Sequence, residues 1–155
     1  MEKEAANSGF NETVSSKKAF SESKILIPTT IFCDRSLSFS EALVEYLKDQ
    51  KQLSYHEIAV LTNRDERNIW TLYNRAGKKR TQKEPAVRKA PTAHIPLEVV
   101  TDRSLSILEI VVEYLRDKAQ LKNSQIAAIL NRSRKTVSTV YIRTKKKRSA
   151  SANEE

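Results

Sequence analysis

Five polar side chains in the last quarter of the chain have the types and the spacing to hydrogen-bond with the base edges of DNA. They are Ser133, Arg134, Lys135, Ser138 and Thr139. On a helix they would lie on one outward face near its first turns, from which side chains can enter the major groove. We expect Arg134 and Lys135 to contact bases or their immediate surroundings, and Ser138 and Thr139 to contact bases or phosphates.

The residues around this group have the chemistry to hold the phosphate backbone, which gives affinity without sequence information. Between Lys122 and Arg148 the chain has nine Lys or Arg residues and no acidic residue. A solvated, frayed helix end is the alternative interpretation of the terminal basic run. The other predicted DNA-binding residues in this half are Arg132, Ile142, Arg143, Lys145, Lys146, Lys147 and Arg148.

A matching set lies earlier in the chain, but two carboxylates, Asp65 and Glu66, accompany it and oppose phosphate. Residues 25–80 have a net charge of +2, whereas residues 95–148 have +7. Trp70 could press on a thymine methyl group, anchor a protein interface or pack against the neighbouring unit. The predicted DNA-binding residues here are Arg64, Arg67, Trp70, Thr71, Asn74, Arg75, Lys78, Lys79 and Arg80.

The residue types needed for enzyme or metal chemistry are sparse. Cys33, His56 and His94 are far apart in the sequence, and no Ser/His/Asp or Cys/His arrangement is apparent. The chain has two glycines, too few for a phosphate-binding glycine loop. We therefore expect a non-enzymatic protein with no metal and no cofactor.

An internal repeat organises the chain. Residues 27–80 align without a gap to residues 95–148 at an offset of 68, and 25 of the 54 aligned positions are identical. A unit of this size is near the lower limit for independent folding, so each unit is expected to depend on the other or on a second chain, which leaves a homodimer open. The sequence predicts a disordered tail over residues 1–24, a unit over 25–80, a linker over 81–94, a second unit over 95–148 and a disordered tail over 149–155.

Each unit is predicted to contain three helices, which gives an all-α fold of two tandem three-helix helix-turn-helix bundles joined by a proline-containing linker. Ser38 with Glu41, and Ser54 with Glu57, have capping-box spacing. In the second unit Lys122 replaces the second capping serine, so Asn123 or Ser124 is the expected cap. Upstream of each bundle, an apolar segment with a proline favours an extended arm that packs on the bundle or pairs between units.

The second and third helices of each unit have the pattern of a helix-turn-helix. Ala59, Asn63 and Ile69 supply a small residue at the helix crossing, a residue tolerant of a left-handed turn and an apolar anchor. Ala127, Asn131 and Val137 repeat these intervals in the second unit. A plain three-helix bundle without DNA-binding function is the alternative interpretation.

This segment resembles the promoter-binding helix-turn-helix of bacterial sigma factors and of LuxR-type regulators. The resemblance covers about half of each unit and rests on Leu53-Ser54, Glu57-Ile58-Ala59, Asn68-Ile69 and Arg75-Ala76, with their counterparts in the second unit. The turn departs from the family pattern, because Arg64 and Arg132 stand where an apolar residue is usual. The chain also resembles small uncharacterised archaeal helix-turn-helix proteins.

Overall charge favours a polyanionic partner, because the chain has 28 basic and 19 acidic residues and a net charge of +9. We expect double-stranded DNA as that partner, no membrane association, and a cytoplasmic protein associated with the nucleoid or chromatin. Transcription regulation by sequence-preferring binding is the leading hypothesis. A non-specific architectural protein of the nucleoid or chromatin, and an adaptor whose first unit binds transcription machinery through Trp70 and Glu66, are the alternatives.

Overall fold

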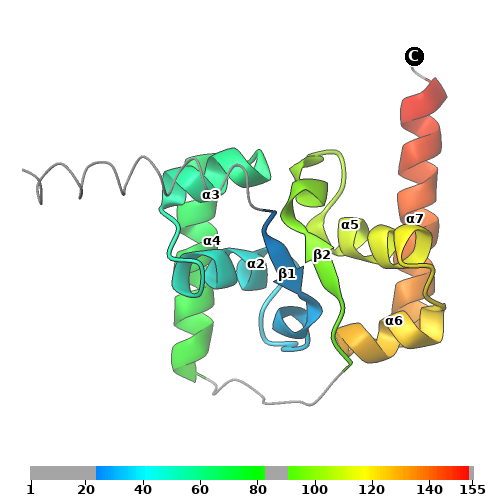
Figure 1. Ribbon diagram of the computed structural model, residues 1–155, viewed down its shortest axis with the longest axis horizontal. Helices are drawn as coiled ribbons and strands as arrows, with labels where there is room; N and C mark the ends of the chain where they lie inside the picture. Colours follow the sequence, from blue (N-terminus) through cyan, green and yellow to red (C-terminus); the bar gives the residue numbers. More distant parts are fainter. Residues whose placement is uncertain (1–23, 83–90, 154–155) are drawn as a thin grey trace, which may run out of the picture.

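The computed structural model describes residues 24–82 and 91–153, and this part of the chain is predominantly helical. It contains six α-helices, three short 3₁₀ or π-helical segments and one two-stranded antiparallel sheet (Figure 1). The sheet departs from the expected all-α fold. Each of its strands has three residues and ends at a proline, which limits how far the ladder can extend.

The helices of the first repeat begin at the caps that the sequence predicts. The Ser38 side chain accepts a hydrogen bond from the Glu41 amide, and Ser54 and Glu57 form a reciprocal capping box. Asp65 accepts hydrogen bonds from the amides of the second and third residues after it. The three helices are α2 (Phe39–Asp49), α3 (Tyr55–Thr62) and α4 (Glu66–Gln82).

The second repeat places its helices at equivalent positions. The helix that follows Lys122 starts without a shift, because the Gln125 side chain accepts a hydrogen bond from the Lys122 amide at 2.8 Å. The expected displacement of this cap to Asn123 or Ser124 is therefore wrong. The elements are α5 (Ile107–Glu113), continued by the π-helix η3 (Tyr114–Lys118), then α6 (Asn123–Leu130) and α7 (Arg134–Asn153).

The extended arms pair with one another across the two repeats. Strand β1 (Leu26–Pro28) lies antiparallel to β2 (His94–Pro96), with Ile27 opposite Ile95. Those two isoleucines are equivalent residues of the repeats, so a local two-fold axis passes between them. Figure 1 shows the sheet in the middle of the molecule, with α4 on one flank and α7 on the other.

One buried core spans both repeats, instead of a separate core in each bundle. Ile27 and Ile95 are each 1% exposed and belong to the same apolar cluster as the helices of both repeats. The 3₁₀ helix η1 (Thr29–Phe32) of the first repeat packs against α6, and η2 (Leu97–Thr101) of the second packs against α3. Each repeat thus contributes a segment to the core of the other.

The ends and the linker differ in part from the expectation. Residues 149–153 were expected to be disordered but form the last turns of α7. In the expected linker, Thr81 and Gln82 belong to α4 and His94 belongs to β2. The predicted tail over residues 1–23, the rest of the linker over 83–90 and residues 154–155 lie outside the described residues. Over residues 24–82 and 91–153, every helix is too short or too polar to cross a membrane.

The turns between α3 and α4 and between α6 and α7 have the predicted left-handed residue. Asn63 and Asn131 each have φ of 54°. Their side chains also reach across the two-fold axis: Asn63 Nδ2 donates to the Thr101 carbonyl at 3.0 Å, and Asn131 Nδ2 donates to the Cys33 carbonyl at 2.9 Å. Each turn is therefore both a bend between two helices and a contact between the repeats.

Substitution of Asn131 separates these two functions. Asn131→Gly keeps the left-handed backbone and loses the side-chain bond to the Cys33 carbonyl, so we expect unfolding free energy to fall by about 1 kcal/mol. Asn131→Ala loses the same bond and keeps a Cβ in the left-handed region without the polar side chain that lets asparagine adopt it, so we expect this variant to be about 1–2 kcal/mol less stable than Asn131→Gly. Urea unfolding followed by circular dichroism measures both losses.

Gln120 provides the control, because it has φ of 58° and its side chain has no such cross-repeat bond among the described residues. We expect Gln120→Gly to raise the unfolding free energy by roughly 0.5–1 kcal/mol. Equal losses for Asn131→Gly and Asn131→Ala would contradict the assignment.

Candidate nucleic-acid interface

Helix α7 is fixed from its inner face, which leaves the predicted base-reading side chains outside. Val137 is 1% exposed, Val140 is 4% exposed, and the Thr144 hydroxyl donates to the Val140 carbonyl within the core. At the start of the helix, the Ser133 hydroxyl accepts from the Thr136 amide at 3.1 Å. Ser133 therefore serves as the helix cap and is less free than predicted to contact a base.

The opposite face of α7 presents basic and small polar side chains to solvent. Arg134, Lys135, Thr139 and Arg143 are exposed, and Ser138 is half-buried beside them. Within the described part of the chain, Arg134, Lys135 and Arg143 form no ion pair. Ile142 and Lys146 extend this exposed face toward the C-terminus. We call the set Arg134, Lys135, Ser138, Thr139, Ile142, Arg143 and Lys146 the outer face of α7.

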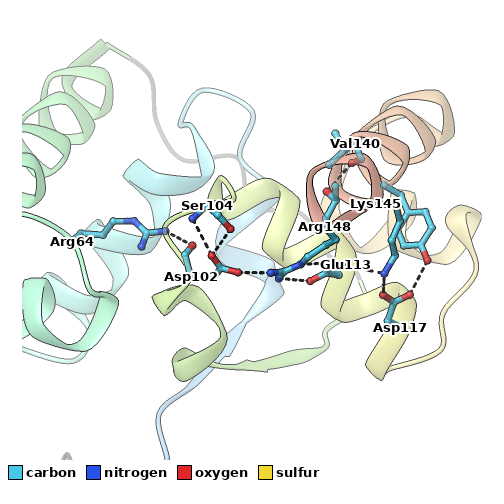
Figure 2. A network of polar contacts seen from close by, with 10 residues as sticks. Arg64, Asp102, Ser104, Glu113, Asp117, Val140, Lys145 and Arg148 are labelled. Carbon is cyan, nitrogen blue, oxygen red and sulfur yellow. Dashed lines mark hydrogen bonds and ion pairs between the residues drawn. The ribbon is translucent and has the colours of Figure 1, made fainter. Parts of the chain in front are cut away.

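The cations at the end of the second repeat mostly pair with acidic residues within the chain, although their side chains stay partly exposed (Figure 2). Lys147 Nζ lies 2.8 Å from Glu109 Oε1, and Arg148 Nη2 lies 2.8 Å from Glu113 Oε1. Arg148 also pairs with Asp102, and Lys145 pairs with Asp117. These three cations are therefore less free than predicted to contact phosphates, because acidic groups within the chain engage them.

The first repeat has the same arrangement. Lys79 Nζ lies 2.8 Å from Glu41 Oε1, and Arg80 pairs with both Glu45 and Asp34. The sequence contained the signal for these pairs, since acidic residues recur every four positions on the first helix of each repeat. Of the two predicted basic runs, Lys78 and Lys146 are the members that remain exposed without an ion pair among the described residues.

Two buried glutamates anchor these pairs. Glu41 is 5% exposed and Glu109 is 3% exposed. Burial raises the pKa of Glu109, but hydrogen bonds from Lys147 and Ser106 outweigh burial and leave that pKa below its ordinary value. Burial likewise raises the pKa of Glu41, and hydrogen bonds from Lys79 and Ser38 reverse the shift. Both carboxylates are therefore held ionised against α4 and α7.

The turn arginines lie at the junction between the repeats. Arg64 Nη1 donates to the Thr62 carbonyl at 3.0 Å, and Arg64 Nη2 donates to the Asp102 carbonyl at 3.3 Å (Figure 2). Arg132 donates to the Leu130 carbonyl at 3.1 Å and lies over the Phe39 ring at 5.1 Å. Both were predicted to contact DNA, but both are half-buried and bonded within the protein. These bonds give both turn arginines a structural function at the junction.

The residues of α4 equivalent to the outer face of α7 form what we call the outer face of α4, and the two faces differ in composition. The outer face of α4 consists of Glu66, Arg67, Trp70, Thr71, Asn74, Arg75 and Lys78. Arg67, Arg75 and Lys78 are exposed, but Thr71 and Asn74 bond with carbonyls of their own helix. Its carboxylates are Asp65, which caps the helix, and Glu66, which lies 3.4 Å from His56 Nδ1. These groups lower the positive charge at the helix start, where a phosphate would otherwise be favoured.

Trp70, on the same face of α4, is 53% exposed. Of the three interpretations that the sequence allowed, packing against the neighbouring unit is therefore wrong. The indole borders a shallow hollow with Tyr55, Glu66, Arg67 and Thr71. It stays available to an external partner.

Over residues 24–82 and 91–153, no three His, Cys, Asp or Glu side chains gather as a metal ion requires. Cys33 is buried, and its Sγ lies 3.0 Å from the Ile129 carbonyl, so it packs between the repeats.

Comparison of the chain with protein-family models, with curated proteins and with solved structures found no match in any of the three. The positions and chemistry of the described side chains carry the functional proposal.

The ion pair of Glu109 with Lys147 makes the free energy of unfolding depend on pH in the acid range. Because its pKa is lowered on folding, the carboxylate stabilises the fold at neutral pH, and this contribution is lost as the pH falls from about 4.5 through the lowered pKa. Lys147→Met leaves Glu109 buried without its partner, so we expect the unfolding free energy at pH 7 to fall by about 1–3 kcal/mol. Denaturant unfolding between pH 2.5 and about 7 should show this difference shrinking toward zero in acid.

Lys146→Met is the matched control, because Lys146 is the neighbouring lysine and is exposed without an ion pair among the described residues. We expect a change below about 0.5 kcal/mol at either pH. A difference for Lys147→Met that stays constant across the pH range would show that the ion pair with Glu109 is not the cause.

Proposed function

We propose that this protein binds double-stranded DNA, and that it is a transcription regulator that prefers particular base sequences. Recognition helices placed in the major groove would read bases, and the surrounding cations would hold the backbone. The single observation that carries the proposal is the outer face of α7. Its cations Arg134, Lys135, Arg143 and Lys146 are exposed, and no acidic residue lies between Lys122 and Asn153.

The order of side chains along α7 supports a division of labour. Arg134 and Lys135 occupy the first turn, where a guanidinium or an ammonium can bond to the acceptors on a guanine edge. Thr139 and Ile142 offer methyl groups that can contact a thymine methyl. Arg143 and Lys146 lie about one and two helical turns beyond Thr139. They suit phosphates, which are the same in every DNA sequence.

The shared core supports a proposal in which one rigid body holds both recognition helices and presents them to the DNA. The spacing between α4 and α7 is set by the β1–β2 pairing and by the cross-repeat bonds of Asn63 and Asn131. A linker that adapts to the DNA is therefore not needed to position the second helix.

Fluorescence anisotropy with a labelled duplex tests DNA binding directly. We expect wild-type affinity to fall steeply with added salt, and Arg134→Ala/Lys135→Ala to weaken binding by at least about tenfold, because each lost base contact costs roughly 1–3 kcal/mol. The control is Lys24→Ala/Lys118→Ala, which removes the same charge from exposed positions that do not belong to the outer face of α7. Binding that is absent or insensitive to salt in the wild type would reject the proposal.

The non-specific architectural function is the second candidate, favoured by Arg143 and Lys146, whose contacts would not depend on sequence. Selection from a random duplex library separates the two functions. A regulator with base contacts from Arg134 and Lys135 should enrich a consensus, and Arg134→Ala/Lys135→Ala should lose part of it. Enrichment of no consensus by the wild type would favour the architectural function.

A further inference from the structure

The two repeats offer an internal comparison, because they share one fold but differ at more than half of their aligned positions. Most of the identical polar residues have a structural function in both copies. They cap helices, form the ion pairs of α4 and α7, or bond across the junction. Among the described residues, three identical pairs of cations have no ion pair and are exposed in both copies. They are Arg35 with Arg103, Arg75 with Arg143, and Lys78 with Lys146.

The pair Arg35 and Arg103 was not among the predicted DNA-binding residues. Each precedes the first helix of its own repeat in sequence, but lies at the turn of the other repeat in space. Arg103 follows Asp102, whose carbonyl accepts from Arg64 Nη2 at 3.3 Å. Arg35 lies close enough to Arg132 for their charges to interact.

Like charges are thus crowded at both junctions. Burial and the neighbouring guanidinium of Arg103 lower the pKa of Arg64. Burial and the guanidinium of Arg35 lower the pKa of Arg132 in the same way. The adjacent carboxylates offset this repulsion only in part: Asp102 acts to raise the pKa of Arg64, and Asp34 that of Arg132, but both pKa values remain lowered. Asp34 is also engaged by Ser36 and Arg80, and Asp102 by Ser104 and Arg148.

The position of each junction relates it to a recognition helix. Arg132 stands two residues before Arg134, the first residue of α7, and Arg64 stands two residues before Glu66, the first residue of α4. An anion bound beside Arg35 would therefore lie near the positive N-terminal end of α7, whose first turn has no acidic residue. One bound beside Arg103 would lie near the start of α4, where Asp65 and Glu66 reduce the positive charge and Arg103 supplies the cation.

We propose that Arg35 and Arg103 bind phosphates of the DNA backbone, each beside the recognition helix of the opposite repeat. The proposal rests on the proposed DNA-binding function and adds two contacts to it. Each half of the DNA site is then held by residues from both repeats. Because these anchors are the same in the two halves and the outer faces of α4 and α7 differ, the bound site is bipartite without being a palindrome.

The salt dependence of binding tests this assignment with the full chain and a fluorescein-labelled duplex of mixed sequence. The slope of log K against log salt is negative, and each lost phosphate contact decreases its magnitude by about 0.9. We expect that decrease for Arg35→Ala and for Arg103→Ala, and about twice that decrease for the double variant. The affinity of each single variant should fall about five- to tenfold near 0.1 M salt.

The control variants are Lys24→Ala and Lys118→Ala, exposed cations whose equivalents in the other repeat, Thr92 and Gln50, are uncharged. Arg35→Lys and Arg103→Lys should keep the slope, since an ammonium also neutralises a phosphate. Thermal unfolding verifies that the variants remain folded. A slope equal to that of the controls in either Arg35→Ala or Arg103→Ala overturns the proposal, while wild-type binding still supports the DNA-binding function. Absence of wild-type binding overturns both.

Discussion

The antiparallel contact of Ile27 with Ile95 is the constraint from which the rest of the arrangement follows. Because equivalent residues face one another, the principal backbone and turn contacts between the repeats occur in pairs. The arms carry η1 onto α6 and η2 onto α3, and the turn asparagines bond to the carbonyls that those arms present. Loss of this pairing would expose both isoleucines and leave each helix-turn-helix without part of its core.

Positive charge serves two purposes in this molecule. Lys79, Arg80, Lys147 and Arg148 neutralise carboxylates of α2 and α5 and so fix the orientation of α4 and α7. The cations on the outer face of α7 lack such partners within the described residues. Net charge therefore overstates what is available to a polyanion, and the unpaired cations are the relevant quantity.

Local features of the fold could be read from the sequence, because short-range chemistry determines them. Capping at Ser38 and Ser54, and the left-handed turns at Asn63 and Asn131, depend on neighbours within a few residues. The shared core and the junction at Arg64 depend on contacts between residues some forty or more positions apart. Sequence periodicity indicates which face of a helix is apolar but not which element covers it, so the pairing of the arms was left as one of two alternatives.

The same limit explains the result for the candidate site. Arg134, Lys135 and Thr139 were correctly placed on an exposed face, because helical periodicity alone puts them opposite Val137 and Val140. The ion pairs of Arg148 were not predicted, because its partners lie 35 and 46 residues earlier in the chain. Arg35 and Arg103 escaped notice because a loop arginine carries no periodic signal, and the comparison between the two copies is what singles them out.

The β1–β2 pairing joins halves of a single polypeptide, and this changes how such a protein can evolve and assemble. In a dimer of identical subunits, any substitution appears twice and dilution dissociates the assembly. Here one half can have Trp70 while the other has Ser138 at the equivalent position. Because the two halves are covalently joined, each is always present at the effective concentration that the connecting chain imposes. Dilution to a few copies per cell would leave the two-fold arrangement intact.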